Sequence, residues 1–133
     1  MQRTIVRVFN VLLVGLFATA AAVQYNDPDP ALWMAIYGSV ALCGILYLGG
    51  WLPFWMPTLL SVACVIGALY LLVQVVGGIG FVDPTGREMV GVTESGREML
   101  GLLFTAGGAA VVAYQVRRNE STGERQASQS QAQ

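Results

Sequence analysis

The residues of this sequence that could do chemistry lie in two polar segments at the ends of long apolar stretches. The candidate polar site comprises eight residues: Asn26, Asp27, Asp29, Trp33, Tyr37, Glu94, Arg97 and Glu98. Carboxylates and turn carbonyls can act as oxygen ligands for a hard cation, and they also accept hydrogen bonds from small polar molecules. The planar guanidinium of Arg97 can hold a carboxylate through two parallel hydrogen bonds. We therefore expect Arg97 to contact the loop that contains Asp27 and Asp29.

A purely structural role for this cluster is the alternative to a ligand site. Asp29 precedes Pro30, a pair typical of a helix start in which the Asp side chain caps free N–H groups. Asp27 and its neighbour Asn26 favour an Asx-type turn. Glu98 lies three residues after Ser95, the spacing of a capping box. A carboxylate pair could also carry out acid–base catalysis, which is the least favoured of the three hypotheses.

Composition excludes several classes of function. The chain is 55% hydrophobic and 11% charged, and its formal net charge is −1. That balance gives no clustered basic face for nucleic acid. Because the sequence contains no His, it can form neither a His-based metal site nor a Ser-His-Asp or Cys-His catalytic unit. We expect no catalytic residue, no cofactor and no enzymatic activity, and the sequence does not say whether the acidic cluster binds a metal.

Four apolar stretches are each close to the ~20 residues that a helix needs to cross a bilayer. They cover residues 8–24, 31–49, 55–76 and 99–116, and none contains Asp, Glu or Arg. Backbone groups in lipid must be hydrogen-bonded within helices or closed barrels, and these stretches lack strict alternation. The sequence predicts an all-α membrane protein, a four-helix bundle of antiparallel transmembrane helices. An alternative for the first stretch is a secretory signal that ends in small residues near Ala22.

The region after the last stretch, residues 117–133, is polar and rich in Gln and Ser, so we expect a disordered tail. Stripes of small residues, such as Gly101, Thr105, Ala109 and Ala113, let helices approach closely. They fit packing inside the bundle or, as an alternative, a homo-oligomer interface. The expected partners are the lipid bilayer and a second copy or another membrane protein.

Two strings in this sequence resemble the transmembrane protein 220 family. The first is Gln24-Tyr25-Asn26-Asp27-Pro28-Asp29-Pro30 with the following Trp33 and Tyr37, and the second is Glu94-x-x-Arg97-Glu98-x-x-Gly101. The resemblance covers about residues 5–116. It implies a small multi-pass membrane protein and carries no reaction, substrate or cofactor with it.

The expected function is a non-enzymatic accessory or interaction protein of the membrane. One alternative is an oligomeric small transporter or channel, although ion-coupled transporters generally place ionisable groups inside the bilayer and these stretches contain none. Another is a binder of a cation or small polar ligand at the acidic, non-cytoplasmic face.

The distribution of arginine predicts the orientation of the chain. An even number of spans puts both termini on one side, together with five of the seven arginines, whereas Arg87 and Arg97 lie on the other. The positive-inside rule then makes both termini cytoplasmic. A reporter fused after Gln133 should be active only in the cytoplasm, and activity on the opposite side would contradict this orientation.

Overall fold

The computed structural model describes residues 2–27, 29–76 and 94–131. Its elements are α1 (Gln2–Val23), the short 3₁₀ helix η1 (Gln24–Asn26), α2 (Pro30–Gly49), α3 (Trp55–Val76) and α4 (Glu94–Gln131). All four α-helices are long and apolar enough to span a membrane, and no strand occurs in the described ranges. The predicted fold class, an all-α membrane bundle, is thereby confirmed. The polar loop around Arg87 lies outside the described residues.

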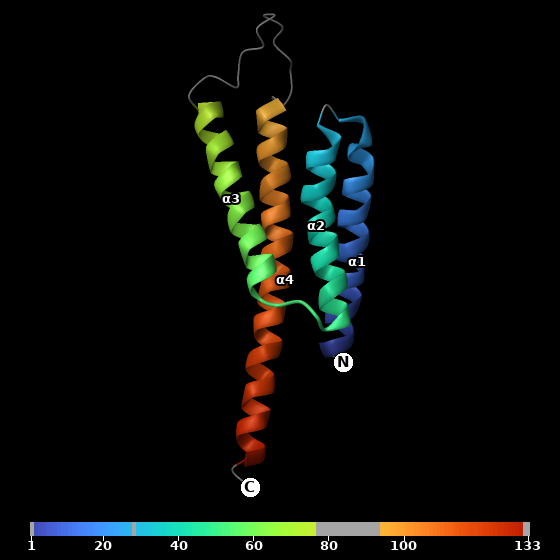
Figure 1. Cartoon of the computed structure of the whole chain (residues 1–133), viewed down its shortest axis with the longest axis vertical. Helices are drawn as coiled ribbons and strands as arrows, with labels where there is room; N and C mark the ends of the chain where they lie inside the picture. The colour runs from blue at the N-terminus through green and yellow to red at the C-terminus, as the bar shows by residue number, and fades with distance from the viewer. Residues whose placement is uncertain (1, 28, 77–93, 132–133) are drawn as a thin grey trace, which may run out of the picture.

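The four helices form two antiparallel hairpins, α1 with α2 and α3 with α4 (Figure 1). The two hairpins meet mainly through α2 and α4. The N-terminus of α1 and the C-terminus of α4 lie at the same end, and the turn from α1 to α2 lies at the other end beside the start of α4 (Figure 1). The first polar segment and the start of α4 therefore share one end of the bundle.

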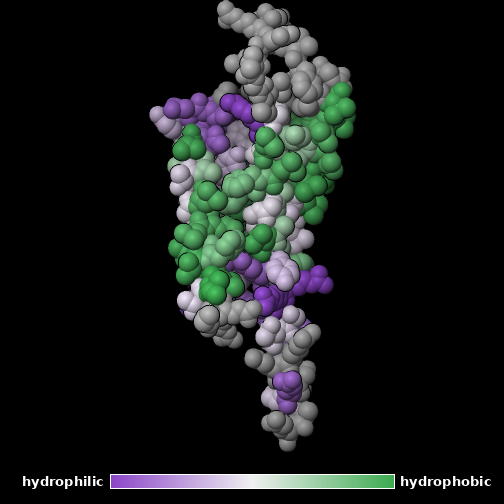
Figure 2. Space-filling model, turned by 180° about the vertical axis from the view of Figure 1, so that it is seen from behind, coloured by the Kyte–Doolittle hydropathy of each residue, from purple (hydrophilic) through white to green (hydrophobic). Residues whose placement is uncertain are grey.

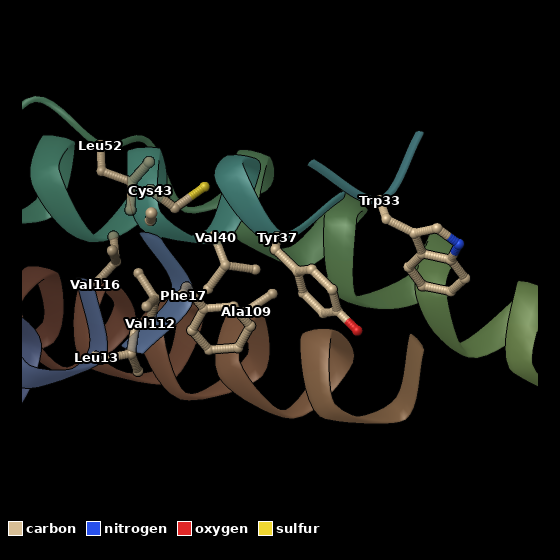
Figure 3. Packing of buried hydrophobic residues seen from close by; sticks show 11 residues of the cluster. Leu13, Phe17, Trp33, Tyr37, Val40, Cys43, Leu52, Ala109, Val112 and Val116 are labelled. Carbon is tan, nitrogen blue, oxygen red and sulfur yellow. The ribbon is translucent and has the colours of Figure 1, made fainter. Parts of the chain in front are cut away.

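The core is a thin seam of side chains between the hairpins (Figure 3). Phe17 of α1 is buried and stacks on Phe104 of α4, with ring centroids 4.7 Å apart. Val40 of α2 and Ala109 and Val112 of α4 are fully buried beside it. Small residues on α4 allow the helix backbones to approach closely. This matters because lipid is as apolar as the core, so close packing is the main attraction between membrane helices.

A second, shorter stripe of small residues, Gly15, Ala18 and Ala22 of α1, has different surroundings from the stripe on α4. On α4, Thr105, Ala109 and Ala113 are buried inside the bundle, which is the packing arrangement considered from the sequence. On α1, Gly15 and the neighbouring small positions face outward, and a Cβ at Gly15 would meet no atom within 4 Å. Internal packing therefore accounts for the α4 stripe and does not account for the one on α1.

The outer surface of the bundle carries the large apolar side chains. Leu12, Leu16, Ile66 and Leu69 are more than half exposed, as are many others on the helices. Figure 2 shows hydrophobic residues across the middle of one face of the bundle, here called the hydrophobic belt, with hydrophilic residues beyond it towards both ends. Such a belt would be an aggregation liability in water and is the surface required in lipid.

Helix α4 is longer than the sequence analysis expects, because it continues to Gln131 through residues for which a disordered tail is predicted. No proline interrupts this region. The hydroxyls of Ser121 and Thr122 donate hydrogen bonds to the Arg118 carbonyl, at 3.0 and 2.9 Å, within the helix. A helix that extends an existing span also avoids the cost of nucleation, and Arg, Glu, Gln and Ala are favourable in its interior.

One polar pair lies within the apolar seam. Asn10 of α1 is fully buried, and its Nδ2 donates to the Val6 carbonyl at 2.9 Å and to Gln115 Oε1 of α4 at 2.6 Å. The Asn10 Oδ1 is buried and has no hydrogen-bond partner within the described part of the chain. The pair ties the two hairpins together near the end that carries the termini.

Two adjacent glycines on α4 test the close packing. A Cβ on Gly108 would lie 2.6 Å from the Phe17 ring and 3.2 Å from Val40, whereas a Cβ on Gly107 would meet nothing within 4 Å. Gly108→Ala should destabilise the bundle by about 1–3 kcal/mol because buried Phe17 has little room to move. Gly107→Ala should leave stability unchanged or slightly raised. Unfolding followed by circular dichroism measures both, and equal effects would contradict this packing.

Candidate functional site

A cavity of about 240 Å³ lies at the end of the bundle opposite the termini. Its lining comes from the turn after α1, the first two turns of α2 and the first turn of α4, and consists of Gln24, Asp27, Trp33, Tyr37, Arg97 and Glu98. Both hairpins contribute to it, so the cavity exists only when they are packed together.

The aromatic wall of the cavity comes from α2. Trp33 and Tyr37 are four residues apart and so lie on one helix face. They are 7% and 8% exposed, and their ring centroids are 5.8 Å apart. The labelled side chains of Figure 3 show Tyr37 between Trp33 and the core residue Phe17. The site is thus a direct continuation of the packed seam.

Gly101 is the position on α4 that admits these rings. A Cβ there would lie 2.6 Å from the Tyr37 hydroxyl oxygen and 3.1 Å from Cζ3 of Trp33. A larger residue would push the aromatic side chains away from α4. This glycine, part of the second string quoted from the sequence, therefore shapes the cavity without lining it.

The charged groups of the cavity come from both hairpins. Asp27 is half-buried after η1, whereas Arg97 is exposed and Glu98 half-buried on α4. No ion pair joins Arg97 to Asp27 or Asp29 in the part of the chain that the structure describes. Arg97 therefore lines the same cavity as Asp27 of the first loop, but the expected direct pairing of its guanidinium with a carboxylate of that loop is not seen among the described residues.

Asp27 also organises the loop that leads into α2. Its Oδ1 accepts a hydrogen bond from the Asp29 N–H at 3.4 Å, which is the connectivity of an Asx turn. The backbone of Asp27 in turn donates to the Gln24 carbonyl at 2.9 Å. These contacts hold the carboxylate at the mouth of the cavity.

Asp29 differs from its expected role. It occupies the N-cap position of α2 with Pro30 following, but its side chain makes no capping hydrogen bond and is exposed. Its backbone carbonyl instead accepts the Trp33 N–H at 3.4 Å. The N–H of Asp29 is already turned toward Asp27, which leaves its own carboxylate in solvent and outside the cavity.

The remaining predicted residues do not contribute to the cavity. Asn26 is exposed at the end of η1. Glu94 is the first residue of α4, and its side chain lies outside the described residues, as does that of Ser95. The proposed capping box between Ser95 and Glu98 therefore stays a prediction.

Gln24 is a cavity residue that sequence reasoning quoted only as part of the first string. It is half-buried and follows the last residue of α1. Gln24 lines the cavity together with Asp27 and Tyr37. Its position could have indicated this role, because Gln24 is a polar residue at the end of the first apolar stretch, shortly before the acidic turn.

The described lining of the cavity offers polar, charged and aromatic groups. No group of three or more potential His, Cys, Asp or Glu ligands occurs among the described residues. The cavity instead combines two carboxylates, one guanidinium and two aromatic rings. Such groups bind ligands through charge-assisted hydrogen bonds and cation–π contacts.

Comparison with known proteins identifies the family. The family model described as "Transmembrane family 220, helix" matches residues 16–114. The chain belongs to transmembrane family 220. A curated protein of this name, transmembrane protein 220 from Xenopus laevis, is 34% identical over 108 residues, which are 76% of this chain and 54% of that protein. The chain thus spans about half the length of this relative, and no solved structure matches it.

The match to transmembrane family 220 includes every element of the cavity. It begins within α1, contains η1 and α2, and ends within α4 at residue 114. All six lining residues fall inside it. The extended end of α4 falls outside it.

Two neighbouring aspartates provide a matched test of the site. We expect Asp27→Asn and Arg97→Gln to show a coupling of at least about 0.5 kcal/mol in a double-mutant cycle, because the two groups share one cavity. Asp29→Asn removes the same charge two residues away, and its effect should add to that of Arg97→Gln within about 0.5 kcal/mol. Unfolding free energies measure both cycles, and equal coupling for the two aspartates would contradict the assignment.

Proposed function

We propose that this member of transmembrane family 220 is a non-enzymatic, accessory membrane protein that binds a small polar molecule in the cavity between its hairpins. The ligand would carry a positive and a negative group. The observation that supports the proposal is the presence of Asp27, Arg97 and Glu98 around one aromatic-walled cavity of about 240 Å³.

The lining residues suggest how the two ends of such a ligand would be held. The carboxylates of Asp27 and Glu98 and the ring faces of Trp33 and Tyr37 favour a cationic group. The guanidinium of Arg97 favours an anionic group. The desolvation cost of moving both ligand charges from water into this site would be offset, because each charge would lie next to a group of opposite charge.

The size and chemistry of the cavity limit the proposal to binding. About 240 Å³ is below the range of ~300–1,000 Å³ that is usual for drug-sized ligands, which favours a compact molecule. The lining residues that the structure describes include no Ser, Thr, Cys or His, and so supply no nucleophile activated by a base. We therefore favour recognition over catalysis.

A single-tryptophan form of the protein tests ligand binding. Trp51 and Trp55 are 82% and 63% exposed and lie far along the chain from the cavity, so W51F with W55F leaves Trp33 as the reporter. Glycine betaine carries both charges, choline only the cation and acetate only the anion. We expect betaine to change Trp33 fluorescence and raise the melting temperature at lower concentration than either half-ligand.

Two substitutions give the controls for this experiment. Arg97→Gln should reduce the advantage of betaine over choline, since only the anionic end loses its partner, whereas Asp29→Asn should leave binding unchanged. A response to calcium chloride alone would indicate a cation site instead. Absence of any response to these compounds, or responses that Arg97→Gln leaves intact, would overturn the proposal.

A further inference from the structure

A second and larger cleft lies at the opposite end of the bundle, near the termini. It has a volume of about 710 Å³ and is formed by α1, by the C-terminal end of α2 with the turn after it, and by α4. The residues that matter for its chemistry are Arg7, Tyr47, Tyr114, Gln115, Arg118 and Asn119. None of these residues lines the first cavity.

The two charged side chains known to line this cleft are both positive. Arg7 from α1 and Arg118 from α4 both line it and are exposed, and the lining residues within the described ranges include no Asp or Glu. Two arginines from different hairpins thus line one space. Guanidinium groups bind phosphate oxygens through paired, charge-assisted hydrogen bonds.

Polar residues hold the walls of the cleft in place. Asn119 Nδ2 donates to the Tyr47 hydroxyl at 3.0 Å, which joins α4 to α2. Gln115 accepts the 2.6 Å hydrogen bond from Asn10, which joins α4 to α1. Beside this contact lies the buried Asn10 Oδ1, for which the described residues supply no donor. The cleft is therefore built by side chains from three helices rather than by one helix surface.

The cleft lies at the edge of the hydrophobic belt. Arg7 on α1 is adjacent to the exposed apolar residues Val8 and Phe9, and Tyr114, 65% exposed, lies one turn before Arg118 on α4. Figure 2 shows hydrophilic residues directly beyond the belt at the end from which the extended helix protrudes. Arginine and tyrosine at this depth meet lipid headgroups rather than acyl chains or bulk water.

We propose that this cleft binds the phosphate of an anionic phospholipid, with Arg7 and Arg118 holding the headgroup between α1 and α4. Basic pockets between transmembrane helices are suited to acidic headgroups because the bilayer supplies the ligand at the same depth. The acyl chains would stay in the bilayer beside the belt. This site is separate from the cavity around Asp27, so the two proposals fail independently.

A neighbouring arginine gives the matched control. Arg117 has the same charge as Arg118, but its guanidinium lies over the Phe54 ring, 5.9 Å from the centroid, and it does not line the cleft. The experiment compares Arg7→Gln, Arg118→Gln and Arg117→Gln with the unmodified protein in nanodiscs of phosphatidylcholine. Phosphatidylglycerol is then added, and lipid retained by the protein is measured by native mass spectrometry together with the melting temperature.

We expect the unmodified protein to retain phosphatidylglycerol in preference to phosphatidylcholine. Arg7→Gln and Arg118→Gln should each weaken this preference about fivefold, the effect of one basic group near an anionic surface. Arg117→Gln should change it less than twofold. Raising the salt concentration should weaken binding in the unmodified protein more than in the double variant of Arg7 and Arg118.

Three results would overturn the proposal. One is equal retention of the two lipids. Another is an equal loss for Arg117→Gln and Arg118→Gln, which would indicate a diffuse effect of net charge. The third is an equal stabilisation by glycerol 3-phosphate in phosphatidylcholine nanodiscs, which would assign the cleft to a soluble phosphate compound. Melting temperatures in pure phosphatidylcholine show whether each variant is folded.

Discussion

The close approach of α4 to the other hairpin is the contact on which the structure depends. Between helices in lipid there is little hydrophobic driving force, so association requires dense packing and a few hydrogen bonds. Here Gly108 receives the Phe17 ring and Gly101 receives Trp33 and Tyr37. The glycines of α4 thus leave room for large aromatic rings of α1 and α2. The positions of these glycines and rings along the helices determine where the hairpins are in contact.

This contact also explains the location of both cavities. The apolar seam fills the middle of the bundle around Val40 and Val112, which are fully buried. At its two ends the seam gives way to polar side chains, Asp27 and Arg97 at one end and Gln115 and Arg118 at the other. Polar groups near the membrane surface remain hydrated or find partners, whereas the same groups at the centre would be costly.

The sequence predicted the features that depend on composition. Long apolar runs without charge specify membrane helices because lipid leaves the backbone no other way to satisfy its hydrogen bonds. The polar segment at Asp27 and the helix start at Arg97 were recognisable because charged residues interrupt those runs, and the antiparallel topology brings them to one end.

Features that depend on local geometry could not be predicted in the same way. Asp27 lines the cavity and Asp29 does not, although the two have the same residue type and lie two positions apart. Gln24 lines the site from the first position of η1, directly after α1. The extension of α4 past Arg117 reflects continuity with a formed helix, which polar composition alone does not reveal.

The length of α4 connects the two faces of the membrane. Its 38 residues correspond to ~57 Å, almost twice the ~30 Å hydrocarbon core. Arg97 and Arg118 lie on this one helix, separated along its axis by ~31 Å. Each cavity therefore has one of its walls on the same helix, and any change in the tilt of α4 would move Arg97 and Arg118 together.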